Sequence, residues 1–75
     1  GAPVELTPKE YELLYLFMRN RNRALYRETI YEHVWGGEYP GTGRTVDLHV
    51  QRLKKKLGLE KEIVAIYKVG YRLIG

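Results

Sequence analysis

The stretch RTVDLHVQRLKKKL, at residues 44–57, decides how the rest of the chain is arranged. A helix advances about 100° per residue, and at that step a narrow apolar stripe is formed by Val46, Val50, Leu53 and Leu57. The opposite side is mostly polar and cationic, with Arg44, Leu48, Gln51, Arg52 and Lys55 on it and Lys54 and Lys56 further round. The stretch predicts an amphipathic helix with one packing face and one basic face. Such a helix suits the phosphates and base edges of a DNA groove.

The length and composition of the chain restrict its class. Its 75 residues indicate one domain, near the size at which a single core is only just sufficient. No apolar run approaches the roughly 18 residues of a membrane span, and no charged-then-apolar leader is found, so we expect neither a membrane nor a targeting segment. The chain has no cysteine, which excludes disulfides and thiolate metal sites and suits a reducing compartment. A cytoplasmic protein, which is the localisation we expect, is compatible with these features but is not established by them.

Basic residues are concentrated in the second half of the chain. Residues 1–43 carry five Lys or Arg and six Asp or Glu, whereas residues 44–75 carry eight and three. The whole net charge of +4 thus originates in the half that contains the basic helix. Such asymmetry is typical of a polyanion-binding surface. On charge alone, a solvated helix face is an equally good interpretation.

The first helix has the clearest start. Thr7-Pro8-Lys9-Glu10 has the form of a capping box, with a Thr hydroxyl at the N-cap, Pro at the first helical position and Glu three residues after the Thr. The helix should cover about residues 8–19. Its apolar residues occupy more than one stripe and predict packing on two sides: Tyr11, Leu13, Leu14, Tyr15, Leu16, Phe17 and Met18. A short edge strand is expected just before it, at residues 4–6.

The remaining elements complete an α+β fold in a single domain over residues 1–75. Residues 24–26 read as a connecting β-segment, and a second helix over about 27–35 places Ile30, Tyr31 and Val34 inward until Gly36-Gly37 ends it. A Gly- and Pro-rich loop at 36–43 leads into the basic helix of about 44–57, which Gly58 ends. Two β-rich runs within about 63–74 are joined by a turn near 68–70. Three helices and a C-terminal hairpin predict a winged helix-turn-helix, whose third helix enters the major groove while the hairpin, the wing, reaches adjacent backbone or the minor groove.

Four segments together resemble a known family. They are LTPKEYELL at 6–14, YRETIYEHVWG at 26–36, RTVDLHVQRLKKKL at 44–57 and VGYRL at 69–73. Their order and spacing resemble the OmpR/PhoB-type effector domain of bacterial two-component response regulators, and the resemblance covers nearly all of the chain from Leu6 to Leu73. It implies sequence-specific binding of double-stranded DNA that regulates transcription, usually by a head-to-tail pair on direct repeats. It also implies control by a phosphorylated receiver domain in the same polypeptide.

The resemblance also implies roles for individual residues. Leu48 and Arg52 match positions that face bases, where a Leu suits a thymine methyl and an Arg suits guanine O6 and N7. Gln51 stands where the family often has a phosphate-binding Arg, so it is expected either to contact phosphate weakly or to read a base edge. The expected phosphate contacts are Arg44, His49, Lys54 and Lys55. The loop matches a segment that can touch RNA polymerase in this family, which would involve Gly37, Glu38, Tyr39 and Pro40.

Two departures from the family pattern affect these expectations. Family members usually have Arg-Gly before Val-Gly-Tyr, and this Arg enters the minor groove from the wing. Here the pair is Tyr67-Lys68, in which Lys68 supplies a cation but Tyr67 supplies no guanidinium. The family also places a four-stranded antiparallel sheet before the first helix. This chain is expected to keep at most the last of those strands, so it is either trimmed or a minimal version of the domain. The broadly apolar first helix favours trimming, because loss of the sheet would leave one of its faces uncovered.

An enzyme or a metal protein is not expected. Asp47 and His49 are two residues apart and would point about 200° from each other on a helix, so they cannot share a metal. No Ser/His/Asp, Cys/His or paired-carboxylate set is evident, and no cofactor is expected. His49 either contacts phosphate or is a structural residue at the edge of the outward face of the helix, and the resemblance favours the phosphate contact. Among the aromatic residues, Tyr11, Tyr31, Tyr71 and Trp35 are expected in the core, while Tyr15, Tyr39 and Tyr67 are candidates for the surface.

The main alternative is a winged helix used as a protein-interaction module. In that interpretation the basic face docks on an acidic partner. Leu48 argues against it, because an apolar residue between Arg44 and Arg52 on the outward face suits a DNA groove and is otherwise awkwardly exposed.

Overall fold

Helix α1 (Pro8–Arg19) begins at the predicted capping box in the computed structural model, which describes residues 5–75. The Thr7 hydroxyl accepts a hydrogen bond from the Glu10 amide at 3.2 Å, and Glu10 Oε1 accepts one from the Thr7 amide at 2.8 Å. Two amides that lack partners within the helix are thereby satisfied. The predicted start of the first helix is confirmed.

The second and third helices also lie close to the predicted ranges. Helix α2 (Arg27–Val34) ends at Trp35, and the chain then turns through Gly36, whose φ is +76°. Helix α3 (Arg44–Leu57) is the basic helix, and it ends at Gly58 with φ of +65°. This left-handed conformation is one that glycine adopts without a steric cost, which explains why the helix stops there.

The sheet has one more strand than the predicted hairpin. Strands β2 (Ile63–Ile66) and β3 (Gly70–Leu73) form that hairpin, and β1 (Leu25–Tyr26), expected only as a connecting segment, pairs antiparallel with β3. The strand order is β1-β3-β2. Gly70 permits this pairing, because a Cβ there would collide with the carbonyl oxygen of Leu25. The wing is thus joined to the start of α2 as well as to the end of α3.

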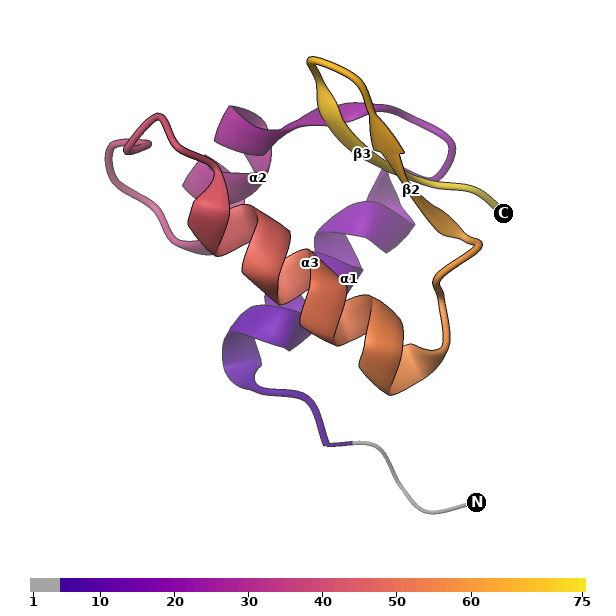
Figure 1. Ribbon diagram of the computed structural model, residues 1–75. Coiled ribbons are helices and arrows are strands. Elements are labelled where there is room, and N and C mark those ends of the chain that lie inside the picture. The colour runs from indigo at the N-terminus through magenta and orange to yellow at the C-terminus, as the bar shows by residue number, and fades with distance from the viewer. Residues whose placement is uncertain (1–4) are drawn as a thin grey trace.

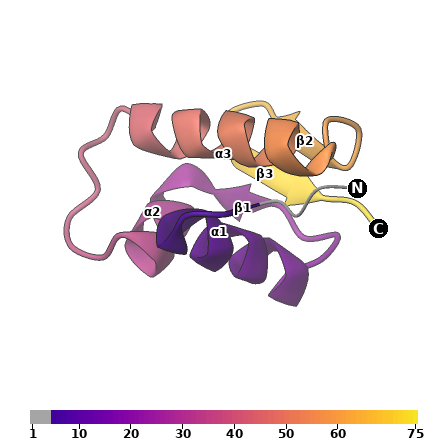
Figure 2. The same ribbon diagram turned by 90° about the horizontal axis from the view of Figure 1, so that it is seen from below.

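The core lies where the three helices meet the inner face of the sheet. Figures 1 and 2 show α3 along one side of the molecule, with α1 behind it and the hairpin beside it. The predicted stripe of α3 is buried here, since Val46, Val50 and Leu53 are all 0% exposed, and Leu57 packs against the edge of the core. The other core residues come from every remaining element: Leu13, Leu16, Phe17, Leu25, Ile30, Val34, Ile63, Tyr71 and Leu73. Burial of one side of α3 leaves its basic side facing outward.

Two expectations about the N-terminal part are wrong. Glu5 and Leu6 form no strand, and Val4 of the expected strand at 4–6 lies outside the described residues. Tyr11, expected in the core, is 62% exposed, and Tyr15 and Met18 on the same helix are also exposed. Periodicity shows that α1 is broadly apolar but does not show which of its sides another element covers. In residues 5–75 only the side with Leu13, Leu16 and Phe17 is covered.

Candidate nucleic-acid interface

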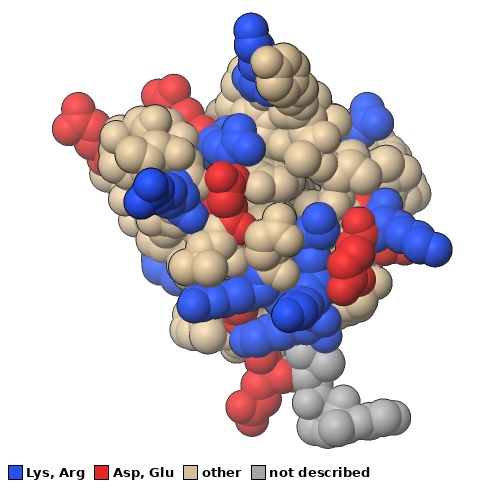
Figure 3. All heavy atoms as spheres, viewed as in Figure 1, with Lys and Arg blue, Asp and Glu red and all other residues tan. Residues whose placement is uncertain are grey.

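The outward side of α3 carries the side chains that the sequence predicts for DNA contact. Leu48 is 49% exposed, and Arg44, Gln51, Arg52 and Lys55 are exposed as well. Figure 3 looks onto this side and shows Lys and Arg side chains gathered over α3. The helix therefore offers one solvent-accessible apolar residue within a cationic and polar surface. This combination matches major-groove reading, in which Arg binds guanine and an apolar group contacts the thymine methyl.

The cations of this side remain available for a ligand. Within residues 5–75, no ion pair is formed by Arg44, Arg52, Lys54 or Lys55. Lys56 differs, because its ammonium binds Glu10 Oε1 at 2.7 Å and the carbonyl oxygen of Glu5 at 3.3 Å. Its role is to join the end of α3 to the start of α1. The four unpaired cations thus lie on the outward side, and the paired cation lies against α1.

The Lys56–Glu10 pair is a structural contact of the interior. Glu10 is 2% exposed, and burial alone would raise the pKa of its carboxyl group. The hydrogen bond and charge of Lys56, together with the hydrogen bonds of Thr7, outweigh burial and hold the pKa of Glu10 below its ordinary value. Glu10 is therefore ionised in the folded protein, and it neutralises Lys56, whose side chain is 37% exposed and reaches α1 from the end of α3.

A shallow groove crosses the C-terminal half of the outward side. It is lined by Gln51, Arg52, Lys54, Lys55 and Glu60. Glu60 was not expected here, because its position depends on how the chain turns after Gly58 and not on the periodicity of the helix. Glu60 places one negative charge beside three cations, so it lowers the attraction of the groove for phosphate without abolishing it.

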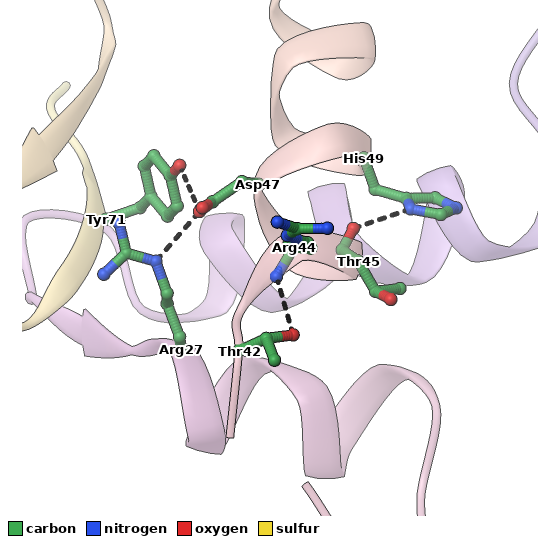
Figure 4. Close-up of polar contacts among 7 residues, drawn as sticks. All are labelled: Arg27, Thr42, Arg44, Thr45, Asp47, His49 and Tyr71. Carbon is green, nitrogen blue, oxygen red and sulfur yellow. Dashed lines mark hydrogen bonds and ion pairs between the residues drawn. The ribbon is translucent and has the colours of Figure 1, made fainter. Parts of the chain in front are cut away.

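Asp47 joins three elements at the N-terminal end of α3. Its Oδ1 accepts a hydrogen bond from Arg27 Nε at 2.8 Å and another from the Tyr71 hydroxyl at 2.7 Å, as Figure 4 shows. The Arg27 guanidinium also lies over the Tyr71 ring, 5.4 Å from its centroid. Helix α2, helix α3 and strand β3 are thereby held together at one oxygen. We call these residues, Arg27, Asp47 and Tyr71, the helix–wing clamp.

The electrostatics of the helix–wing clamp follow from these contacts. The hydrogen bond to Asp47 raises the pKa of Arg27. Burial, followed by the Asp47 carboxylate, raises the pKa of Tyr71 to about 12. At neutral pH the clamp is therefore an ion pair with an intact phenol. Arg27 was not among the expected site residues and Asp47 was considered only as a metal ligand, because no short-range pattern in the sequence brings residues 27, 47 and 71 together.

His49 lies at the boundary between the outward side and the packed side of α3. Its Nδ1 lies 2.8 Å from the carbonyl oxygen of Thr45, one turn earlier in the same helix (Figure 4). The His49 ring meets the ring of Trp35 edge to face, with centroids 4.8 Å apart. Trp35 is half-buried and packs against the core, and its other side stacks on Tyr31. Within residues 5–75 no cluster of His, Asp and Glu suited to a metal ion includes His49.

The Tyr67-Lys68 pair, which stands where the resemblance implies Arg-Gly, lies at the hairpin turn of the wing. Tyr67 is 87% exposed, and Lys68 Nζ lies 5.5 Å from the centroid of its ring. Lys68 has φ of +62°, a left-handed conformation that suits glycine. The Gly of the family's Arg-Gly pair would fit this backbone without strain. Lys68 therefore holds a cation at the turn in a conformation that is costly for a residue with a side chain.

The loop at 36–43 is exposed but anchored. Gly37, Glu38 and Pro40 are exposed, while Tyr39 is half-buried and meets the ring of Tyr31 at 5.7 Å between centroids. Gly43, at the N-cap of α3, has φ of +70°, and a Cβ there would lie 2.6 Å from Arg27 Cδ. The loop thus closes tightly onto the start of α3, where only glycine fits.

This arrangement defines a class of protein. Three helices, a small antiparallel sheet with a hairpin, and an outward basic third helix make a winged helix-turn-helix DNA-binding domain. A family model described as "Transcriptional regulatory protein, C terminal" matches residues 1–73. The chain belongs to this family, the OmpR/PhoB-type C-terminal DNA-binding domains of transcription regulators, which is not a family of enzymes.

Known transcription regulators resemble this chain in both sequence and structure. The transcriptional regulatory protein ResD of Bacillus subtilis is 44% identical over 77 residues, which cover 96% of this chain and 32% of ResD. The DNA-binding domain of Bacillus subtilis CssR has a TM-score of 0.86 at 42% identity, with 97% of this chain and 82% of that chain covered. The DNA-binding domain of the response regulator AdeR, in complex with an intercistronic region, has a TM-score of 0.83 at 29% identity, with 96% and 74% covered. The chain spans about a third of the length of the curated relatives it matches. None of the helices in the described part is long and apolar enough to cross a membrane.

Proposed function

We propose that α3 enters the major groove of double-stranded DNA and reads its sequence. In this proposal Leu48, Gln51 and Arg52 face the bases. The phosphates are bound by Arg44, His49, Lys54 and Lys55. The observation that carries the proposal concerns ion pairs within residues 5–75. None is formed by Arg44, Arg52, Lys54 or Lys55, whereas Lys56 pairs with Glu10 of α1. A helix that bound no polyanion would gain stability by pairing such cations with acids.

The wing is the second proposed contact. Tyr67 and Lys68 lie at the turn of the hairpin, which the helix–wing clamp ties to the N-terminal end of α3. With α3 in the major groove, the turn reaches adjacent backbone or the minor groove. Lys68 binds phosphate as a point charge, and the exposed ring of Tyr67 packs on the sugar and base edges. The wing therefore contributes contact more than base discrimination.

The wider role is proposed from the relatives. We propose that the chain is a single domain, the effector part of a bacterial response regulator in the cytoplasm, and that a receiver domain elsewhere in the polypeptide controls it. Two copies bind direct repeats head to tail, and the exposed loop residues Gly37, Glu38 and Pro40, with Tyr39 anchoring them, touch RNA polymerase. The support is the membership of the family and the regulatory function in the names of the relatives.

A salt titration tests whether the basic side binds DNA. The affinity for a duplex is measured at several salt concentrations for the wild-type chain, for Lys54→Ala and for Lys61→Ala, a control in the turn before β2. Phosphate neutralisation predicts a linear fall of log affinity with log salt, with a slope lower by about one in Lys54→Ala and unchanged in the control. A flat response, or no binding, would reject DNA binding by this side and favour the protein-interaction module.

A further inference from the structure

The hydrogen bond of His49 determines which ring nitrogen carries a proton. Nδ1 lies 2.8 Å from the Thr45 carbonyl oxygen. A carbonyl oxygen only accepts hydrogen bonds, so Nδ1 must carry the hydrogen. In a neutral imidazole the other nitrogen is then an unprotonated acceptor. In the free protein at alkaline pH, Nε2 of His49 therefore presents a lone pair to its surroundings.

This tautomer conflicts with the proposed phosphate contact unless the ring gains a proton. Phosphate oxygens are acceptors too, so a neutral His49 held by Thr45 cannot donate to them from Nε2. An imidazolium can, because both of its nitrogens carry hydrogens. We propose that His49 binds a DNA phosphate only as imidazolium, so that DNA binding takes up a proton at Nε2. This inference rests on the proposed function, since it concerns the chemical form of one of its phosphate contacts.

In the described part of the chain, no carboxylate is paired with His49. Trp35, directly after α2, meets the ring edge to face and has no titratable group. On α3, Thr45 lies one turn before it and the cation Arg52 almost one turn after it. The loop at 36–43 contributes Tyr39, which packs on Tyr31 behind Trp35, and the exposed acid Glu38. Among residues 5–75, no carboxylate forms an ion pair with His49. A DNA phosphate would therefore be the anion that favours protonation.

The DNA affinity should therefore depend on pH, and this dependence should come from His49. A ligand that binds the protonated form more tightly is bound more tightly as pH falls through the range in which histidine titrates, between about pH 5 and 8. The log affinity should rise as pH falls, with a slope approaching about one per pH unit if one proton is taken up. The chain offers a matched control, because its other histidine, His33, is exposed on α2.

The experiment measures duplex affinity from pH 5.5 to 8.5 at constant ionic strength. The duplex carries the sequence that the chain selects from a random pool. His49→Gln supplies a neutral N–H donor near the position of Nε2, whereas His33→Gln changes only the control histidine. We expect the wild type and His33→Gln to bind more tightly as pH falls, and His49→Gln to lose that slope. A wild type without the slope, or a His49→Gln variant that keeps it, would overturn the inference.

Two further readouts separate this inference from the proposed function. Ring ¹⁵N NMR of the free protein at pH 8.5 should show the hydrogen on Nδ1 of His49, and addition of duplex should increase the fraction of His49 that is protonated at Nε2. A hydrogen on Nε2 in the free protein would overturn the inference. A His49→Ala variant that binds as well as wild type at every pH would reject the phosphate contact itself. If His49→Ala weakens binding but retains the wild-type pH slope, only the proton inference fails.

Discussion

Removal of the Tyr71 hydroxyl tests how the wing is held against α3. In Tyr71→Phe the ring stays in the core, where Tyr71 is 3% exposed, but the hydrogen bond of 2.7 Å to Asp47 is lost. A hydrogen bond to a charged group contributes about 1.5–3 kcal/mol to stability. The Asp47 side chain is 42% exposed and still accepts from Arg27, so water and Arg27 compensate for part of the loss. We expect the free energy of unfolding at pH 7 to fall by about 1 kcal/mol.

Urea denaturation measures this change, and Tyr67→Phe is the matched control. Tyr67 is 87% exposed, so removal of its hydroxyl should leave the stability unchanged. For a chain of this size, a loss of 1 kcal/mol corresponds to a fall in Tm of about 4–8 °C. A double-mutant cycle with Asp47→Asn should show that the two changes are not additive, because both act on the same contact.

The pH dependence gives a second test of the same contact. Burial and Asp47 raise the pKa of Tyr71 to about 12 from its ordinary value of 10.0. The folded protein therefore holds the phenol proton more tightly than the unfolded chain does. The stabilisation is complete below pH 10 and is lost as pH rises through about 12. The wild type and Tyr67→Phe should lose stability in this window, and Tyr71→Phe should lose less. If Tyr71→Phe matched Tyr67→Phe at pH 7 and in this window, the helix–wing clamp would be refuted.

Three further substitutions test other contacts, each by urea denaturation. Lys56→Met should lower stability by about 2 kcal/mol, because it leaves the buried Glu10 carboxylate without its cation. Lys56 helps to hold the pKa of Glu10 below its ordinary value in the folded state, so the wild type loses this stabilisation as pH falls. Lys56→Met removes that effect, so the variant should lose less stability on acidification, and equal acid profiles would contradict the assignment. Gly70→Ala should lower the free energy of unfolding by about 3 kcal/mol, because the added Cβ meets the Leu25 carbonyl oxygen. An unchanged free energy of unfolding would reject the pairing of β1 with β3. Lys68→Gly should raise stability by about 0.5–1 kcal/mol, because it relieves the left-handed backbone, while weakening DNA binding; a loss of stability would contradict this account of the turn.

The helices were predictable because their signals are local. The capping box at Thr7 and Glu10 marks the start of α1 within four residues, and Gly58 marks the end of α3 at a single position. The period of α3 assigns Val46 and Leu48 to opposite sides, and the structure agrees. The β-segment at residues 24–26 was expected, but its pairing with β3 was not, because Leu25–Tyr26 is very short and its partner lies near the other end of the chain.

The candidate site was predictable only where it follows from one helix. Helical geometry places Arg52 and Lys55 outward without reference to other elements. The helix–wing clamp forms only where three elements meet, so no spacing in the sequence indicates it. The error at Tyr11 has the same origin, because a pattern shows that a side is apolar but not that a neighbour covers it.

Selection of bound sequences from a random duplex pool tests the central claim, that α3 reads bases through Arg52 and binds phosphate through Lys54. The wild-type chain, Arg52→Ala and Lys54→Ala are compared at near-physiological salt with competitor DNA. We expect the wild type to enrich a motif of direct half-sites about 10–10.5 bp apart. Arg52→Ala should lose preference at one base position in each half-site, at a cost of about 1–3 kcal/mol, while Lys54→Ala should keep the motif and bind all sequences more weakly. An unchanged motif in Arg52→Ala, or no motif with the wild type, would contradict the claim.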